Sequence, residues 1–167
     1  MKSNKLLAFK SLILSLSIIF AGSNVYAETT FEKIKRTGKV TVGTEAAFPP
    51  FEFVEDGKIV GYGKDILDYI IADLGVELDQ LDLPWQGILP GVLAGKFDFV
   101  ATSVSIRAER AKKYAFTVPI AEGTNWVMKR NGDTSIMSPD DLSGKVVCTQ
   151  LASGSEKATK EWEADMK

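Results

Sequence analysis

Hydrophobic and polar positions repeat with two different periods along this chain. The segment Lys39–Thr44 alternates with a period of two and is rich in β-branched residues, which predicts a strand. Residues 65–74 place isoleucine and leucine on one helical face, and Gly75 follows as a C-terminal cap. Within residues 51–61, two apolar pieces flank Asp56-Gly57, the pattern of a β-hairpin.

The alternation continues beyond this first helix. It predicts strands over residues 76–83, 97–101, 124–130 and 145–150, and helices over 87–95, 107–114 and from Ser153 onward. Pro90 falls in the first turn of its predicted helix, where proline is tolerated. Ser138 is the expected N-cap of a helical turn that starts at Pro139, and Ser153 and Glu156 have capping-box spacing. Strands that alternate with helices indicate βαβ units and an α/β fold with a largely parallel sheet.

Composition adds mainly exclusions. The 167 residues are 45% hydrophobic and 25% charged, which is typical of a globular protein. The chain has no histidine and one cysteine, which excludes a Ser-His-Asp triad, a Cys-His pair, a His-based or Cys-rich metal site and an internal disulfide. Cys148 lies in a strand-like run and is predicted to be a buried, unreactive thiol, with a reactive thiol as the alternative.

The N-terminus is predicted to be a signal peptide that ends at Ala27. Three lysines precede an apolar run over residues 11–22, and Val25 and Ala27 occupy the −3 and −1 positions of the cut. The run is shorter than the ~20 residues that span a bilayer, so we expect soluble export rather than a membrane anchor. Cleavage leaves 17 basic and 22 acidic residues, and this net charge of −5 argues against a nucleic-acid partner.

One polar loop, residues 101–110, carries most of the candidate chemistry. It follows a predicted strand and so leaves the carboxyl end of a parallel sheet, where ligands bind in open α/β folds. It contains the hydroxyls of Thr102, Ser103 and Ser105, the start of a helix, and two arginines. A guanidinium can hold a carboxylate through two parallel hydrogen bonds, and a helix N-terminus favours anions. The loop is therefore either an anion site or a polar connection to a solvated helix.

Aromatic residues follow two other predicted strands. Phe48 and Phe51 flank the rigid Pro49-Pro50 pair, and Trp85 lies between a strand and a helix. These rings either line the same cleft as the polar loop or cover the core, and the residues alone leave both possibilities open.

Several motifs in the same order resemble solute-binding protein family 3, the periplasmic receptors of ABC importers for polar amino acids. They are Phe-Pro-Pro-Phe-Glu at 48–52, Gly-Tyr-Gly-Lys-Asp-Ile at 61–66, the run from Trp85 to Asp98, Ser-Val-Ser-Ile at 103–106 with Glu109-Arg110, and Phe116-Thr117 with Pro119. The similarity extends from about residue 38 to the C-terminus. No single motif would be specific, but their shared order is.

The resemblance implies an α/β, periplasmic-binding-protein-like two-lobe fold of type II. Lobe 1 would span residues 28–118, the hinge crossing residues 119–123, and the start of lobe 2 residues 124–167. The strand and helix that begin at Lys145 have no later strand to pair with, so we expect lobe 2 to be incomplete and interpret the chain as truncated at its C-terminus.

The resemblance also implies how an amino acid would be held by its carboxylate. Arg110 would bind the α-carboxylate, helped by hydroxyl and backbone groups of Ser103 and Ser105. Ser153 and Gly154 would meet the same group at a helix N-terminus. The acidic partner of the α-ammonium is expected beyond Lys167.

The ligand's side chain would meet three other residues. Phe48 and Trp85 would enclose it, and Glu45 would face its polar end, which favours a basic side chain. The chain departs from the family at Arg107-Ala108, where Thr-Pro is frequent, at Ala152, where glycine is usual, and at Gly154, where a hydroxyl residue is common. The contribution of Arg107 is left open.

The expected function is therefore capture of a polar or basic amino acid by a monomeric periplasmic receptor, which delivers it to the membrane subunits of an ABC permease. No catalysis, metal or cofactor is expected. The alternatives are a cyclohexadienyl dehydratase on the same scaffold that acts on arogenate or prephenate, the sensory domain of a membrane receptor, and a fragment without function.

Overall fold

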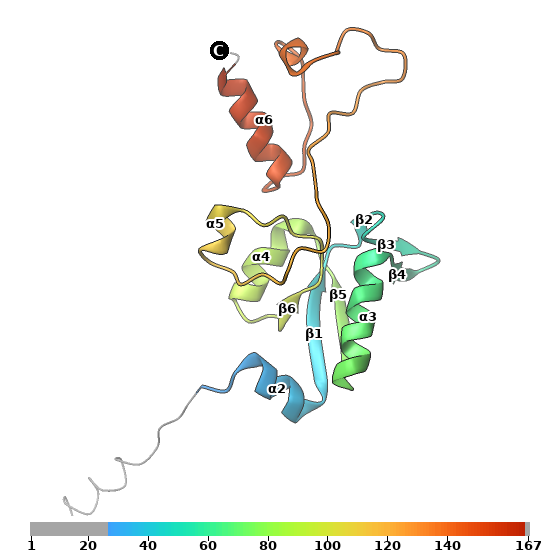
Figure 1. The fold of residues 1–167 in the computed structure, drawn as a ribbon, viewed down its shortest axis with the longest axis vertical. Coiled ribbons are helices and arrows are strands. Elements are labelled where there is room, and N and C mark those ends of the chain that lie inside the picture. The colour runs from blue at the N-terminus through green and yellow to red at the C-terminus, as the bar shows by residue number, and fades with distance from the viewer. Residues whose placement is uncertain (1–26, 166–167) are drawn as a thin grey trace, which may run out of the picture. The chain divides into compact units, whose positions relative to one another are not determined.

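The structure, a computed structural model, describes residues 27–165 (Figure 1). The predicted signal peptide lies outside the described residues except for Ala27. The first described element, α2 (Thr30–Thr37), begins with a reciprocal cap. The Glu32 N–H donates to Thr29 Oγ1 at 3.2 Å, and the Thr29 N–H donates to Glu32 Oε2 at 2.9 Å. Among the described residues, no helix is both long and apolar enough to cross a membrane.

A parallel sheet in the order β5-β1-β6 follows, as the alternation of strands and helices predicts. It consists of β1 (Lys39–Thr44), β5 (Glu77–Asp82) and β6 (Phe99–Val100) (Figure 1). The central strand β1 pairs with β5 along its whole length and with β6 at two positions. Val40 and Val42 of β1 are fully buried, so the first strand in sequence is also the centre of the core.

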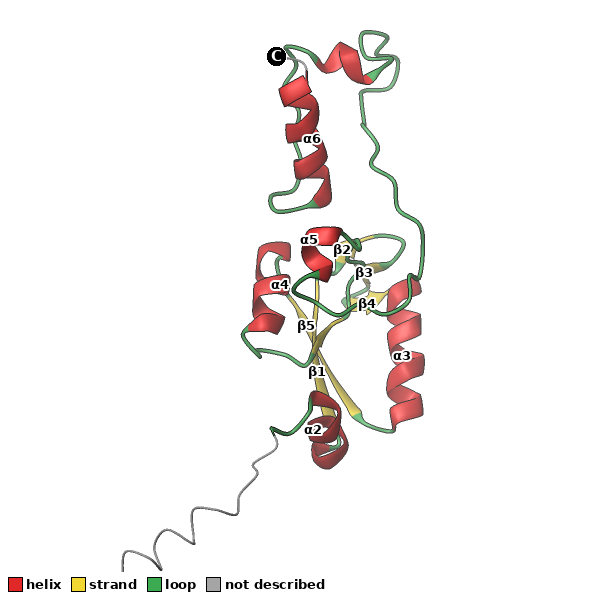
Figure 2. Cartoon of the chain, turned by 60° about the vertical axis from the view of Figure 1, so that its left-hand side comes forward, coloured by secondary structure: helices red, strands yellow, loops and turns green. Residues whose placement is uncertain are grey.

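Two helices cover opposite faces of this sheet, α3 (Tyr62–Leu74) and α4 (Trp85–Leu93) (Figure 2). α3 buries Leu67 and Ile71 and ends at Gly75, whose φ of 64° is left-handed. The Gly75 N–H donates to the carbonyls of Ile71 and Ala72, which confirms the predicted cap.

Helix α4 begins two residues earlier than the apolar pattern predicts. Pro90 therefore lies inside the helix and not in its first turn, so that prediction is wrong. Because proline has no N–H, it cannot donate to the carbonyl of Gln86 one turn before it.

A second, antiparallel sheet contains β2 (Ala47–Phe48), β3 (Glu52–Glu55) and β4 (Lys58–Val60). The predicted hairpin is confirmed, with Glu55 opposite Lys58. Its two turn residues, Asp56 and Gly57, have φ values of 50° and 74°, as a type I′ turn requires.

The ring of Phe97 fills the space between β1 and α4. It is 4% exposed, and two glycines make room for it. A Cβ added at Gly43 would lie 2.6 Å from Phe97 Cζ, and one at Gly91 would lie 2.6 Å from Phe97 Cε1. Phe97 thus belongs to the core just before β6, and β6 covers only two of the predicted strand residues 97–101.

The later part of the chain differs most from prediction. The polar helix α5 (Ala108–Ala111) is four residues long, and residues 124–130 and 145–150 are not strands. Alternation alone does not make a strand, since the backbone also needs a partner to pair with. Because these segments have no partner strand among the described residues, Met128 and Val146 are each 95% exposed. Cys148 is likewise exposed, so the prediction of a buried thiol is wrong.

Two predicted helix starts in this part are confirmed. Ser138 caps the short 3₁₀ helix η1 (Pro139–Leu142) through a capping box with Asp141. A longer helix, α6 (Gly154–Asp165), begins directly after Ser153.

Candidate ligand-binding site

Three connections leave the carboxyl edge of the parallel sheet close together. Glu45 follows β1, Trp85 follows β5 after a two-residue link, and residues 101–105 follow β6. In open α/β sheets this edge is where ligands bind. The first connection is fastened to the end of β5, because the Ala46 N–H donates to Asp82 Oδ1 at 2.9 Å.

A buried threonine ties the third connection to the sheet. Thr44 is fully buried at the end of β1. Its hydroxyl donates to the Ala101 carbonyl at 2.9 Å and accepts from Gln80 Nε2 at 2.9 Å. One side chain thus joins all three strands at the point where the polar loop begins.

Arg110 of α5 is the arginine for which carboxylate binding is predicted, and several groups support it. Its guanidinium donates to the Ser105 carbonyl at 3.1 Å and to the Ala152 carbonyl at 3.4 Å. It also lies over the ring of Trp85, 5.2 Å from the ring centroid. Trp85 is 8% exposed, so in this structure it is a platform for Arg110.

The electrostatic environment of Arg110 favours an anion. Burial lowers the pKa of Arg110, and the nearby positive charge of Arg107 lowers it further. Both effects disfavour the charged form of a guanidinium that stays protonated at neutral pH. The negative charge of a bound carboxylate would offset both the burial of the Arg110 guanidinium and its repulsion by Arg107.

Arg107, whose role the sequence leaves open, lies against the start of α6. A Cβ at Gly154 would overlap the Arg107 guanidinium, so glycine leaves the space that the arginine occupies. Among the described residues, Arg107 Nε is the one buried side-chain nitrogen or oxygen without a hydrogen-bond partner. Two of the departures from the family pattern, Arg107 and Gly154, are therefore next to each other and fit one another.

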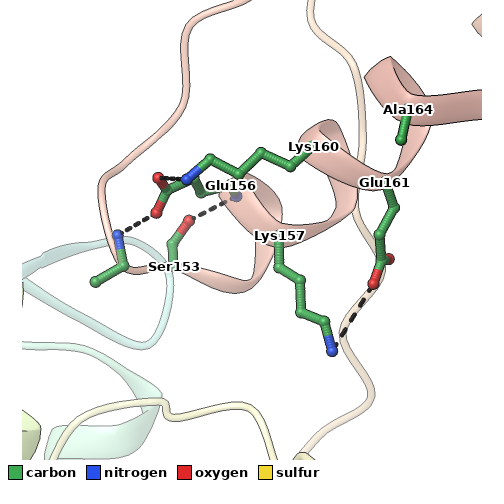
Figure 3. Close-up of a pocket in the computed structure, with 7 residues that line it drawn as sticks. Ser153, Glu156, Lys157, Lys160, Glu161 and Ala164 are labelled. Atoms are coloured by element: carbon green, nitrogen blue, oxygen red, sulfur yellow. Dashed lines mark hydrogen bonds and ion pairs between the residues drawn. The ribbon is translucent and has the colours of Figure 1, made fainter. Parts of the chain in front are cut away.

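Ser153 caps α6 as predicted, with one difference. Its Oγ accepts from the Glu156 N–H at 3.1 Å, but the Glu156 carboxylate accepts from the N–H of Ala152, at 2.6 Å, instead of that of Ser153 (Figure 3). A hollow runs along this side of α6, lined by Ala152, Ser153, Glu156, Lys157, Lys160, Glu161 and Ala164. It includes Ser153 but none of the predicted ligand residues that precede residue 150.

Glu45 is partly buried and already has one partner. Its Oε1 accepts from Gln150 Nε2 at 2.7 Å. Its backbone carbonyl is 3.5 Å from the Thr102 hydroxyl, which places it beside the polar loop.

Phe48 contributes an exposed ring face. It stacks on Phe51 with ring centroids 5.6 Å apart, and Phe51 meets Tyr62 edge-on at 6.2 Å. Phe48 itself is 51% exposed. The expected enclosure of a ligand by Phe48 and Trp85 remains a prediction.

Glu52, for which the sequence predicts no role, is 2% exposed. Its Oε1 accepts from the Thr102 hydroxyl and the Ser103 N–H, each at 2.6 Å, and its Oε2 accepts from the Ser103 hydroxyl at 3.0 Å. The sequence feature that could have pointed to Glu52 is its position as the one acidic residue of the Phe-Pro-Pro-Phe-Glu motif. Nothing in that motif alone, however, indicates its partners fifty residues later.

Comparison with known proteins gives consistent matches. Residues 40–165 match the family described as bacterial extracellular solute-binding proteins, family 3. A probable amino-acid ABC transporter-binding protein of Haemophilus influenzae is 28% identical over 164 residues, which are 98% of this chain and 61% of that protein. An ancestral arginine-binding protein bound to arginine has 38% identity and a TM-score of 0.73, over 77% of this chain and 57% of that one. The ancestral amino acid-binding protein AncCDT-1, a precursor of cyclohexadienyl dehydratase, has 33% identity and a TM-score of 0.72, over 80% and 61%.

The chain spans about half the length of the curated relatives it matches, between 46% and 61% for the H. influenzae protein and two others. These likenesses confirm the predicted fold class, an α/β two-lobe fold of the type II periplasmic binding proteins.

Proposed function

Because the chain belongs to family 3 of the bacterial extracellular solute-binding proteins, we propose that it captures an amino acid with a polar or basic side chain for an ABC importer. The observation that carries this proposal is the position of Arg110. Its guanidinium reaches the Ser105 carbonyl on one side and the Ala152 carbonyl on the other. An α-carboxylate is the anion that such a guanidinium would recognise in a free amino acid.

The carboxylate would be shared between Arg110 and the start of α6. Ser153 and Gly154 supply that helix N-terminus, which carries partial positive charge. Ser105 would complete the proposed carboxylate side from the loop after β6, whereas Ser103 in the same loop already donates its N–H and hydroxyl to Glu52. Desolvating the carboxylate without these partners would cost several kcal/mol, which is why closure and charge pairing would occur together.

The rest of the proposed binding site selects the side chain. Phe48 and Trp85 would provide apolar cover, and Glu45 would accept hydrogen bonds from a polar or cationic end. Gln150 already holds one Glu45 oxygen at 2.7 Å, which would keep the carboxylate oriented. The second oxygen is then the one we assign to the ligand.

Domain boundaries and delivery form part of the same proposal. Lobe 1 would span residues 28–118, residues 119–123 would cross between lobes, and residues 124–167 would begin lobe 2. The two lobes would close on the ligand by hinge motion. The closed, monomeric receptor would then dock on the membrane subunits of a permease. Export to the periplasm by a signal peptide ending at Ala27 is our proposed route.

The enzyme alternative has weaker support. The matched protein related to cyclohexadienyl dehydratase is described as an ancestral amino acid-binding protein and a precursor of the enzyme. This likeness therefore supports binding. Incubation of the chain with arogenate or prephenate should leave both compounds unchanged, and measurable turnover of either would reverse the assignment.

Isothermal titration calorimetry of the purified chain tests the proposed function. L-arginine, L-lysine, L-histidine, L-glutamine and L-cystine form the panel, with L-leucine as an apolar comparison. We expect saturable one-to-one binding of at least one polar or basic member and weaker binding of leucine. Absence of binding across the panel contradicts the proposal for this chain.

The proposed role of Glu45 gives a sharper test. Glu45→Gln removes the negative charge but keeps an oxygen acceptor, so affinity for L-arginine should fall about tenfold, which corresponds to about 1.4 kcal/mol. Affinity for neutral L-glutamine should change by less than about twofold. Glu55→Gln, at an exposed position of β3, is the matched control. Equal losses of affinity for arginine and glutamine would show that Glu45 does not distinguish a charged ligand side chain from a neutral one.

A further inference from the structure

The proposed function gives no role to the carboxylate of Glu52, although burying it is unfavourable. Burying a charge in a protein interior costs free energy unless hydrogen bonds or an opposite charge compensate for it. Among the described residues, no lysine or arginine forms an ion pair with Glu52. The compensation therefore comes from neutral donors.

All three side-chain contacts of this carboxylate go to two consecutive loop residues. The Thr102 hydroxyl and the Ser103 N–H converge on one oxygen at 2.6 Å, and the Ser103 hydroxyl reaches the other at 3.0 Å. Hydrogen bonds to an ionised acceptor are stronger and shorter than those between neutral groups. The loop after β6 is thus attached to the hairpin by a cluster of charge-assisted bonds.

The carboxylate is also held firmly on its own side. Glu52 starts β3 and pairs with Phe48 across the small antiparallel sheet. A Cβ at Gly63 would lie 2.8 Å from Glu52 Oε2, so the first turn of α3 closes against the carboxylate. The Gly63 N–H donates to the Phe51 carbonyl at 2.7 Å, which fixes that turn to the residue before Glu52. The Glu52 carboxylate therefore has a fixed position, and residues 102–105 can be oriented by their hydrogen bonds to it.

We propose that Glu52 is a positioning residue for the ligand site, an inference that rests on the proposed function. It sets the backbone of residues 102–105 and, through the Ser105 carbonyl, the place where Arg110 is held. The loop's position then depends on a side chain that never touches the ligand.

The same contacts change the role expected for Ser103. Its N–H and its hydroxyl proton are both given to Glu52, so neither is available to a ligand carboxylate. Thr102 commits its hydroxyl proton in the same way at 2.6 Å. Ser103 therefore acts by its position in the loop, and Arg110 remains the main donor to the carboxylate on this side.

Two measurements test the proposal, one without ligand and one with it. In the ligand-free, isotopically labelled chain, nuclear magnetic resonance reports the Ser103 amide proton. Glu52→Ala should move that proton's resonance upfield and speed its exchange with solvent by at least about tenfold, since its hydrogen bond is lost. Glu52→Gln retains the oxygen that accepts two of the three bonds and should restore most of the protection.

Binding of L-arginine and L-glutamine, each followed by calorimetry, is the second measurement. Glu52→Ala should weaken the bound member of this pair by at least about tenfold, and Glu52→Gln should recover affinity to within about threefold of the parent. Glu55→Gln, on the same strand but exposed, should leave affinity unchanged. Ser103→Ala removes one of the three hydrogen bonds to Glu52. Its affinity should therefore lie between those of Glu52→Gln and Glu52→Ala.

The outcomes separate this inference from the proposed function. If Glu52→Ala is folded, as judged by far-ultraviolet circular dichroism, and binds as tightly as the parent, the positioning role is wrong. If Glu52→Ala does not fold, the comparison of Glu52→Gln, Ser103→Ala and the double variant decides, because a shared mechanism requires non-additive losses of affinity. A parent chain that binds no polar or basic amino acid of the calorimetry panel overturns the proposed function and the binding role of Glu52 with it. An unchanged Ser103 amide in Glu52→Gln and Glu52→Ala overturns the contact itself.

Discussion

Replacement of Arg110 by alanine should lower the affinity of the chain for its amino acid by at least about 100-fold. Removing one partner of a desolvated, hydrogen-bonded charge pair costs about 2–5 kcal/mol, and 100-fold corresponds to about 2.7 kcal/mol. The loss should be large because Trp85 and the Ser105 and Ala152 carbonyls hold the Arg110 guanidinium in a fixed orientation. Calorimetry with the amino acid that binds the parent most tightly measures it.

Two further variants make the Arg110 result specific. Arg110→Lys keeps the positive charge but loses the planar fork, so its affinity should lie between those of the parent and of alanine. Arg130→Ala removes an exposed arginine from residues 124–130 and should leave affinity unchanged. If Arg110→Ala binds as tightly as the parent, the carboxylate is held elsewhere.

Gly91→Ala should destabilise the fold by about 1–3 kcal/mol, although alanine is the better helix former. The reason is Phe97, whose Cε1 would lie 2.6 Å from the new methyl group. The ring is buried and cannot move aside, because Gly43 on β1 gives it equally little room on the other side. Chemical denaturation followed by circular dichroism gives the free energy of unfolding.

Helix α4 contains its own control for this prediction. A Cβ at Gly87 meets no atom within 4 Å, so Gly87→Ala should be neutral or stabilising by up to about 1 kcal/mol. Replacing the Phe97 ring with the smaller side chain of leucine should partly restore the stability that Gly91→Ala loses. The double variant should therefore be more stable than the sum of the two single changes predicts. A Gly91→Ala chain as stable as Gly87→Ala would mean that the core around Phe97 is looser than this structure has it.

Within residues 39–83 much of the fold could be predicted, because short-range rules decide it. The strand Lys39–Thr44 is found within its predicted bounds, and Gly75 and the turn at Asp56-Gly57 adopt the left-handed backbone that their sequence favours. Each of these features depends on a period, a cap or a turn within a few residues. The core position of Phe97 could not be predicted, since it depends on Gly43 of β1, which is distant in sequence.

The segment beyond residue 118 could not be predicted in the same way. Residues 124–130 and 145–150 have the alternation of strands, yet no strand pairs with them among the residues that the structure describes. A buried Cys148 followed from the same assumption and is wrong for the same reason. Local patterns indicate what a segment can form, and a partner decides whether it does.

The candidate site shows a similar division. Arg110 and Trp85 were selected for separate roles, and the structure places the guanidinium over the indole. Their direct contact could not be predicted, since it depends on how α4 and α5 are placed. Glu52 was passed over because its importance lies in contacts with Thr102 and Ser103, which no local spacing encodes.

The position of β1 has a consequence for how this chain can fold during synthesis. β1 is made first, but both strands that pair with it, β5 and β6, come later. Val40 and Val42 therefore have no neighbouring strand until β5 has emerged from the ribosome, and Val42 has a strand on both sides only once β6 has followed. Pairings between parts so distant in sequence form slowly, and apolar strands that wait for them are exposed in the meantime. The strand order thus sets a minimum length of nascent chain, ending near Val100, below which this sheet cannot close.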